Sequence, residues 1–185
     1  MKTLLDAVNM MLETINEQPL TDDVDLDNSL EGQIARTVLL RKKNSILSDG
    51  WDVNSDEAFQ FTPDSNGIIG IPSNVLEITS LDGRSIMRDW RLYNKVEKTF
   101  KYTSPVLCDV KWDIEFEDLT FSLAYYIAVS AAREFQMHMI GDTSIDNALR
   151  EEQSKALIKA ESNEGFTDQS NMLDSMRILL KRSHF

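Results

Sequence analysis

Three aspartates near the N-terminus have the type and spacing that come closest to a metal site. Asp23, Asp25 and Asp27 stand at positions 1, 3 and 5 of an EF-hand loop counted from Asp23. Such a loop binds Ca²⁺ through carboxylate and carbonyl oxygens, and it also requires Gly at position 6 and Glu at position 12. The chain has Asn28 and Ile34 at those positions, so the EF-hand motif fails.

No stronger pattern for a metal or a cofactor accompanies these aspartates. The simpler interpretation is a solvated acidic loop from Thr21 to Ser29 that caps the following helix, with a looser cation site as the alternative. His138 and His184 belong to no H-E-x-x-H pattern. Cys108 is the only cysteine, so neither an intrachain disulfide nor a cysteine metal cage can form. We therefore predict no metal and no cofactor.

Catalytic patterns are equally sparse. The seven glycines form no phosphate loop or dinucleotide turn, and there is no G-x-S-x-G. Carboxylate pairs such as Glu115 and Glu117 have the chemistry of a glycosidase, but 31 acidic residues produce such pairs by chance. We predict that the chain is not an enzyme and has no catalytic residues. A hydrolase acting on cell-envelope polysaccharide is the alternative.

Composition narrows the class of protein further. The 185 residues are 42% hydrophobic and 27% charged, enough for one core, or one core and a small subdomain. A net charge of -12 repels nucleic acid. It does not exclude a protein that lets DNA pass without binding it. The most apolar run, 119–132, is shorter than the ~20 residues that span a bilayer. The N-terminus is typical of a helix rather than a secretory signal, so we expect a soluble protein without a membrane segment.

Helical signals occupy both ends of the sequence. Thr3 with Asp6 forms the pattern of a capping box. The helices that we expect are, in order, one from Thr3 that ends at Pro19, one from about Ser29 to Gly50, one from Leu119 to about Met139 that Gly141 stops, and one capped by Asp142 or Thr143 that runs to about Glu164. Glu151 and Lys155 form a favourable pair on the wet face of the last helix.

Strand signals lie between the second and third of these long helices. The clearest is the alternation of Cys108, Val110, Trp112, Ile114 and Phe116 with polar residues, which predicts a half-buried strand. Weaker candidates are 51–53, 58–61, 68–71 and 75–79, with turns at 54–56, 63–67 and 81–84, and a hairpin of 88–93 with 99–102. The predicted fold is α+β, a helical bundle with an inserted antiparallel β region. We expect bundle segments at 1–50 and 117–165, the β region at 51–116, and an extended tail at 166–185.

The tryptophans and the cysteine all fall in this β region. We expect Trp51, Trp90 and Trp112 to lie in the core of the sheet rather than to anchor an interface. Cys108 is on the apolar side of its strand, which favours an inert core residue. Exposed tryptophans would instead favour a carbohydrate-binding module.

The C-terminal segment is both apolar and basic, and it follows a polar stretch. Such a segment either frays or docks onto an acidic neighbouring subunit. The candidate contact residues are Asn171, Met172, Leu173, Arg177, Ile178, Leu179, Lys181 and Arg182.

Segments along most of the chain, from about Leu4 to Leu173, match one family in order and spacing. They are LLDAVNMMLETINEQPL, GWDVNSDEAFQFTPDSNGIIGIPSNVLEI, DWRLYNKVEKTFKY, FEDLTFSLAYYIAVSAAREFQMHMIGD, LREE and NML. With them the chain resembles tail tubular protein A, the head-to-tail adaptor of T7-like short-tailed bacteriophages. Asn16 and Thr120 depart from the residues common in the family, both at turn or cap positions.

The resemblance implies a structural virion protein, made in the host cytoplasm, at the head-tail junction. Members form a dodecameric ring between the portal protein and the tubular nozzle, tail tubular protein B. Tail fibres attach near the lower junction, and DNA leaves through the channel without sequence-specific binding. The resemblance also makes the portal a candidate partner of the C-terminal segment. A carbohydrate-binding tail component is a further alternative.

In such a ring, two charged segments offer a contact. The acidic residues 22–27 could face the basic Arg36, Arg41, Lys42 and Lys43 of a neighbour, or either could stay wet. We expect the β region to form the platform that faces nozzle and fibres, and the helices to form the ring wall under the portal.

Overall fold

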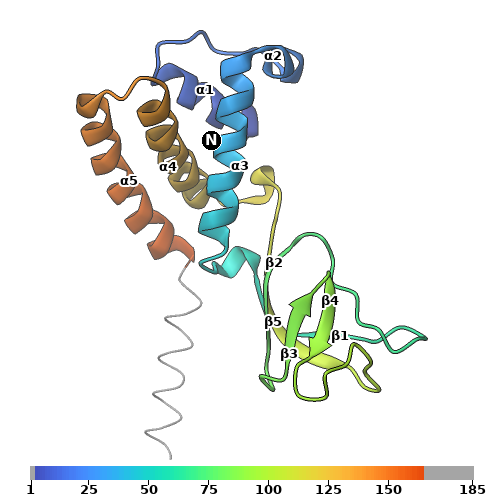
Figure 1. Ribbon diagram of the computed structural model, residues 1–185. Coiled ribbons are helices and arrows are strands. Elements are labelled where there is room, and N and C mark those ends of the chain that lie inside the picture. The colour runs from blue at the N-terminus through green and yellow to red at the C-terminus, as the bar shows by residue number, and fades with distance from the viewer. Residues whose placement is uncertain (1–2, 165–185) are drawn as a thin grey trace, which may run out of the picture. The chain divides into compact units, whose positions relative to one another are not determined.

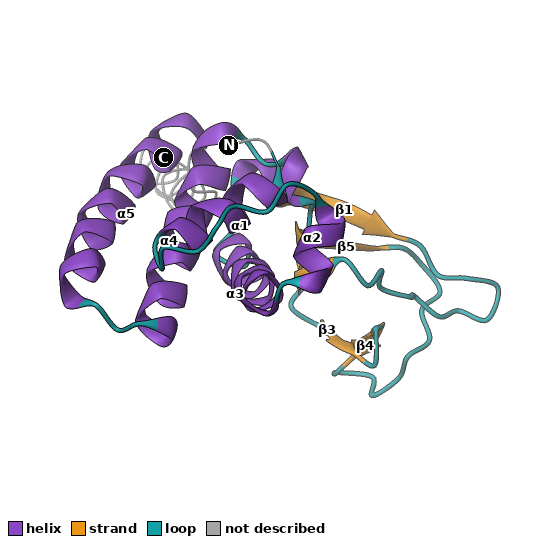
Figure 2. Ribbon diagram, turned by 90° about the horizontal axis from the view of Figure 1, so that it is seen from above, coloured by secondary structure: helices purple, strands orange, loops and turns teal. Residues whose placement is uncertain are grey.

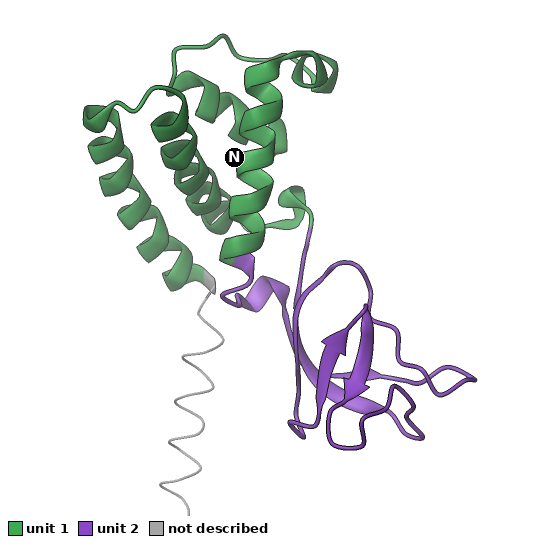
Figure 3. Ribbon diagram, viewed as in Figure 1, with its two compact units in different colours: residues 1–46, 115–185 green, residues 47–114 purple. Residues whose placement is uncertain are grey.

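The computed structural model describes residues 3–164, and these fold into five α-helices and five strands. The chain forms two compact units, residues 1–46 with 115–185, and residues 47–114 (Figure 3). The first is helical and the second holds the strands (Figure 1). The predicted α+β fold, with an antiparallel β region inserted into a helical bundle, is confirmed.

Helix α1 (Leu4–Glu13) begins as its sequence predicts. The hydroxyl of Thr3 accepts a hydrogen bond from the N–H of Asp6, whose carboxylate accepts one from the N–H of Thr3. The helix ends at Glu13, before the predicted Pro19, because Asn16 turns the chain with a left-handed φ of 59°. The Asn9 side chain then bonds both backbone groups of Leu20. These bonds fix the return of the chain along α1.

The predicted acidic loop at Thr21–Ser29 is wrong, because most of it forms helix α2 (Asp23–Asn28). Asp22 caps this helix by accepting a hydrogen bond from the N–H of Asp25. Carboxylates in the first turn favour the helix through its dipole. Leu26 is buried and supplies the apolar contact that so short a helix needs.

Three longer helices complete the helical unit: α3 (Leu30–Leu47), α4 (Phe121–Met139) and α5 (Thr143–Glu164). Helix α4 is buried on several sides, as its apolar sequence predicts, and packs against α1 and α5. Gly141, with a φ of 74°, ends α4, and Asp142 caps α5 as predicted. Within this unit, Figures 1 and 2 both show α5 at one edge, α2 and α3 at the other, and α4 between them.

The central strand of the β unit is the one that the alternating pattern predicts. Strand β5 (Val106–Trp112) pairs antiparallel with β1 (Ser55–Phe61) and with β2 (Val75–Ser80). Its inward residues Cys108 and Val110 are buried. They share a core with Phe61, Ile69, Ile71, Val75 and Leu92.

Three weaker strand predictions are wrong. Residues 51–53 enter a 3₁₀ turn (Asp52–Asn54), in which the Asn54 amide donates to the carbonyls of Leu47 and Trp112, and β1 starts at once. Residues 68–71 form isolated bridges rather than a strand. The hairpin pairs β3 (Ser85–Arg88) with β4 (Arg91–Asn94), so 99–102 is not its second strand.

No helix within residues 3–164 combines the length and the apolar character that crossing a membrane requires.

The β unit offers a direct test of its turns. Gly67 and Gly83 have left-handed φ values of 80° and 65°, and a Cβ on Gly67 would lie 3.1 Å from the Tyr102 carbonyl. We expect Gly67→Ala and Gly83→Ala each to lower the free energy of unfolding of this unit by about 1–2 kcal/mol, with Gly67→Ala the worse. Urea unfolding followed by tryptophan fluorescence measures it, because all three tryptophans lie in residues 47–114.

Gly70→Ala is the matched control. Gly70 has no left-handed φ and no atom within 4 Å of an added Cβ, so its substitution should leave the midpoint nearly unchanged. Equal losses at all three positions would contradict the assignment of the cost to left-handed strain.

Candidate interaction surfaces

The contact residues predicted in the C-terminal segment lie outside the described residues. They are Asn171, Met172, Leu173, Arg177, Ile178, Leu179, Lys181 and Arg182. Their role therefore stays a prediction, and the described surfaces supply the remaining candidates.

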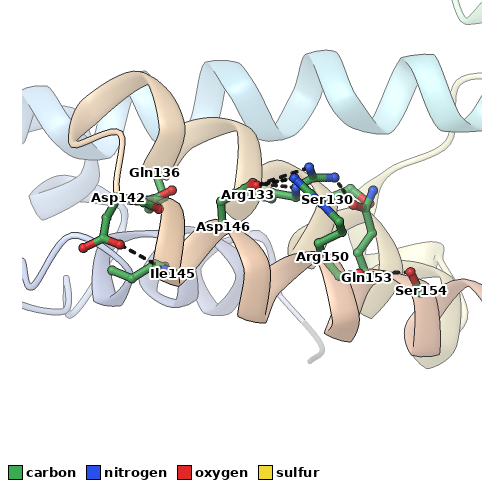
Figure 4. Close-up of polar contacts among 9 residues, drawn as sticks. All are labelled: Ser130, Arg133, Gln136, Asp142, Ile145, Asp146, Arg150, Gln153 and Ser154. Carbon is green, nitrogen blue, oxygen red and sulfur yellow. Dashed lines mark hydrogen bonds and ion pairs between the residues drawn. The ribbon is translucent and has the colours of Figure 1, made fainter.

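One arginine of α4 bonds two side chains of α5, beside the buried apolar residues of that helix. Arg133 Nε lies 2.7 Å from Asp146 Oδ1, and its Nη1 donates to Gln153 Oε1 at 3.1 Å. Gln153 in turn donates to the Ser130 hydroxyl, and Arg150 bonds the second oxygen of Asp146 at 2.7 Å. Figure 4 shows these side chains converging from the two helices. The network joins both helices at several points and fixes their relative register.

Asp146 is the electrostatic centre of this network. Hydrogen bonding from Arg133 holds the pKa of the Asp146 carboxyl below its ordinary value, and the charges of Arg133 and Arg150 act in the same direction against the effect of burial. The carboxylate is therefore ionised at neutral pH and bonded by two guanidinium groups.

Part of the basic segment on α3 is neutralised within the chain. Arg36 pairs with Asp27 at 3.3 Å, and both Arg41 and Lys42 pair with Glu134 of α4. Partial burial opposes ionisation of Glu134, but the bonds from Lys42 and Arg41 outweigh it and lower its pKa. These three cations thus form ion pairs with carboxylates of the same chain.

A groove between α4 and α5 is the most apolar of the described surface hollows. It has a volume of about 350 Å³ and is lined by Phe121, Tyr125, Glu152, Lys155, Ala156 and Lys159. Phe121 is 58% exposed at its edge. The Tyr125 hydroxyl donates to Glu152, which raises the pKa of Tyr125 to about 12, with burial adding to the effect. We call these six residues the lysine-edged groove.

The opposite edge of the helical unit carries exposed apolar side chains among aspartates. Val24 on α2 and Leu30 at the start of α3 are each 66% exposed. Asp22, Asp23 and Asp25 are exposed beside them in the sequence. We call these five residues the acidic edge.

The β unit has its own exposed tip, where the prediction of core tryptophans fails for one residue. Trp51 is fully buried and Trp112 is half-buried, whereas Trp90 is 54% exposed. Asp89 and Trp90 form the turn of the β3–β4 hairpin, and both have φ near +53°. A bulky residue in the left-handed region stores strain, which is common where a side chain serves binding.

The groups proposed for chemistry do not assemble. Cys108 is buried, as predicted, and burial raises its pKa to about 11, so its thiol stays protonated. Glu117 accepts a hydrogen bond from the N–H of Leu4. Within residues 3–164, no three His, Cys, Asp or Glu side chains are close enough to hold a metal ion.

The comparisons with known proteins point to one family. The model of the tail tubular protein family matches residues 5–170 of this chain. Tail tubular protein A of Klebsiella phage KP34 is 31% identical over 161 residues, which cover 85% of each chain.

The Arg133–Asp146 pair predicts a response of the helical unit to acid. Because the Asp146 pKa is lower in the folded than in the unfolded chain, the pair stabilises fully above about pH 4 and loses its effect as pH falls through the folded value. We expect Asp146→Asn to be less stable than the wild type at pH 7. Below pH 4 its free energy of unfolding should fall less steeply with pH, by a slope that corresponds to at most one proton. Circular dichroism at 222 nm during urea unfolding, from pH 3 to pH 7, measures both effects.

Glu161→Gln is the control, since Glu161 is exposed on the same helix and forms no ion pair with the described residues. It should follow the wild-type curve. An Asp146→Asn protein with the full wild-type slope would mean that Asp146 contributes nothing to acid unfolding.

Proposed function

This chain belongs to the tail tubular protein family and is thus a structural component of a phage tail, and we propose that it is the head-to-tail adaptor of its virion. In this role it forms a ring, a dodecamer, between the portal protein and the tubular nozzle formed by tail tubular protein B. The ring encloses the channel for genome ejection and provides the site where tail fibres attach.

The observation that carries the proposal is the extent of the match. Residues 5–170 include both units, so the likeness covers the helices and the inserted β region together. A non-enzymatic role agrees with surfaces whose notable features are exposed apolar side chains and ion pairs. Phe121, Leu30 and Trp90 are each more than half exposed, so an assembly that covers them would remove apolar surface from water.

The two units offer separate contacts for the separate partners. We propose that the helices form the ring wall under the portal, and that the β unit, with Trp90 at the tip of its hairpin, faces nozzle and fibres. Aromatic residues flanked by arginines, here Arg88 and Arg91, are frequent centres of protein interfaces. The basic C-terminal residues Arg177, Lys181 and Arg182 would contact the portal or the next subunit.

Exposed Trp90 also favours one second candidate, a carbohydrate-binding tail component. Stacking of a sugar on the indole would quench its fluorescence. Titration with envelope polysaccharide fragments separates the two functions, because the adaptor should show no saturable quenching, and Trp90→Phe serves as the control.

Electron microscopy of the purified chain, alone and mixed with the portal protein of the same phage, tests the adaptor. We expect rings with a central channel, either free or stacked on the portal. A chain that forms no ring and binds neither portal nor nozzle protein under either condition would exclude the adaptor role.

The C-terminal contact has its own test. Arg177→Glu with Lys181→Glu and Arg182→Glu should weaken ring formation or portal binding at least about tenfold, because three attractive charges become repulsive. Lys95→Glu with Lys98→Glu, two exposed lysines of the β unit, is the control and should bind normally. Sedimentation velocity measures both, and unchanged binding by the triple variant would remove the segment from the interface.

A further inference from the structure

We propose that the helical unit binds a second copy of this chain head to tail, with the lysine-edged groove of one copy receiving the acidic edge of the next. The inference rests on the proposed function, because it supplies the subunit contact of the ring. It names a partner for two surfaces that the fold leaves exposed.

The apolar parts of the two surfaces match in kind. Phe121 borders a groove whose floor includes the buried Ala156, and it is 58% exposed. Val24 and Leu30 are the most exposed apolar residues of the opposite edge, at 66% each. Covering side chains of this size removes about 25 cal/mol per Å² of apolar area from water, which favours a contact that buries all three.

The charges complement each other as well. Lys159 supplies the positive charge of the groove, because Lys155 is already held by Glu151, while Asp22, Asp23 and Asp25 flank Val24. The groove also holds Glu152 and has Glu151 beside it. Each of these carboxylates is engaged within the subunit, since Glu152 accepts the Tyr125 hydroxyl and Glu151 pairs with Lys155 at 2.6 Å. Lys159 has no ion pair with the described residues, so its ammonium group can meet an aspartate of another copy.

Rival occupants fit less well. The basic segment of α3, the other cation source that the sequence suggests, already binds Asp27 and Glu134 of its own subunit through Arg36, Arg41 and Lys42. The C-terminal segment of the chain is basic, with Arg177 and Lys181, and would place like charges against Lys159. An acidic apolar surface is the better partner for the groove.

The placement of the two surfaces decides the symmetry. Figures 1 and 2 both show α5 and α2 at opposite edges of the helical unit, with α4 between them. A contact between two different surfaces on opposite edges leaves each bound copy with one free edge of each kind. Such a contact repeats from copy to copy and closes into a ring or continues as a filament.

Two variants, each with one blocked surface, test the pairing. The groove variant is Phe121→Glu with Lys159→Glu, and the edge variant is Val24→Glu with Leu30→Glu, so that both altered surfaces gain negative charge and repel each other. All four side chains are exposed, and circular dichroism verifies the fold of both proteins. We expect each variant alone to lose self-association at least about tenfold, because one surface of every contact is blocked. Sedimentation velocity and mass photometry measure the species, with and without the portal protein.

Mixing the variants gives the sharpest result. The groove variant keeps an intact acidic edge, and the edge variant keeps an intact groove, so one dimer forms and cannot extend. An equimolar mixture should therefore contain 1:1 dimers and no larger species. Ile86→Glu, at an exposed apolar residue of the β unit, is the control and should assemble like the wild type.

The outcomes separate this inference from the proposed function. If both variants still form rings like those of the wild type, free or on the portal, the pairing is overturned and the adaptor role stays intact. Dimers formed by either variant alone would replace the head-to-tail contact with a symmetric one. A wild-type chain that forms neither free rings nor rings on the portal would overturn both.

Discussion

The contact of α4 with α5 combines buried apolar side chains with a single guanidinium that aligns the two helices. Arg133 lies on a helix that is otherwise largely buried, so its charge requires partners within reach. It finds them in Asp146 and Gln153, two residues seven positions apart on α5. Two bonded points about two turns apart fix both the sliding and the rotation of one helix on the other. The positions of Lys155 and Lys159, and thus the shape of the groove, follow from that constraint.

The fold could be predicted where one local pattern dominates. A few residues suffice to predict the local structure at three places: the capping box at Thr3, the alternation in β5 and the turn from Gly141 to Asp142. Helix α2 could not be predicted from a local pattern, because its run of aspartates favours a loop. The cap from Asp22 and the burial of Leu26 outweigh that preference. The hairpin turn at Asp89 and Trp90 escaped because tryptophan rarely adopts a left-handed φ.

The interaction surfaces were harder to predict than the fold, because exposure depends on tertiary packing. Three tryptophans in one β region have the same local signal, yet Trp51 is buried and Trp90 is open. A usable signal did exist for the network on α4, since a lone arginine within an apolar helix demands an acidic partner. The pairing of Arg36 with Asp27, nine residues apart, was visible only once α2 had folded back beside α3.

Internal neutralisation also bears on how a protein of net charge -12 would treat DNA. Affinity for phosphate comes from cations that release counterions when they bind the duplex. Arg36, Arg41 and Lys42 are each within 4 Å of a carboxylate of their own subunit, so phosphate would compete with an existing partner for each of them. If a second copy also covers Lys155 and Lys159, few cations in the described part of the helical unit stay available to the duplex. If the proposed ring forms, a wall of such subunits would hold DNA weakly, because Arg36, Arg41 and Lys42 already have carboxylate partners within their own chain.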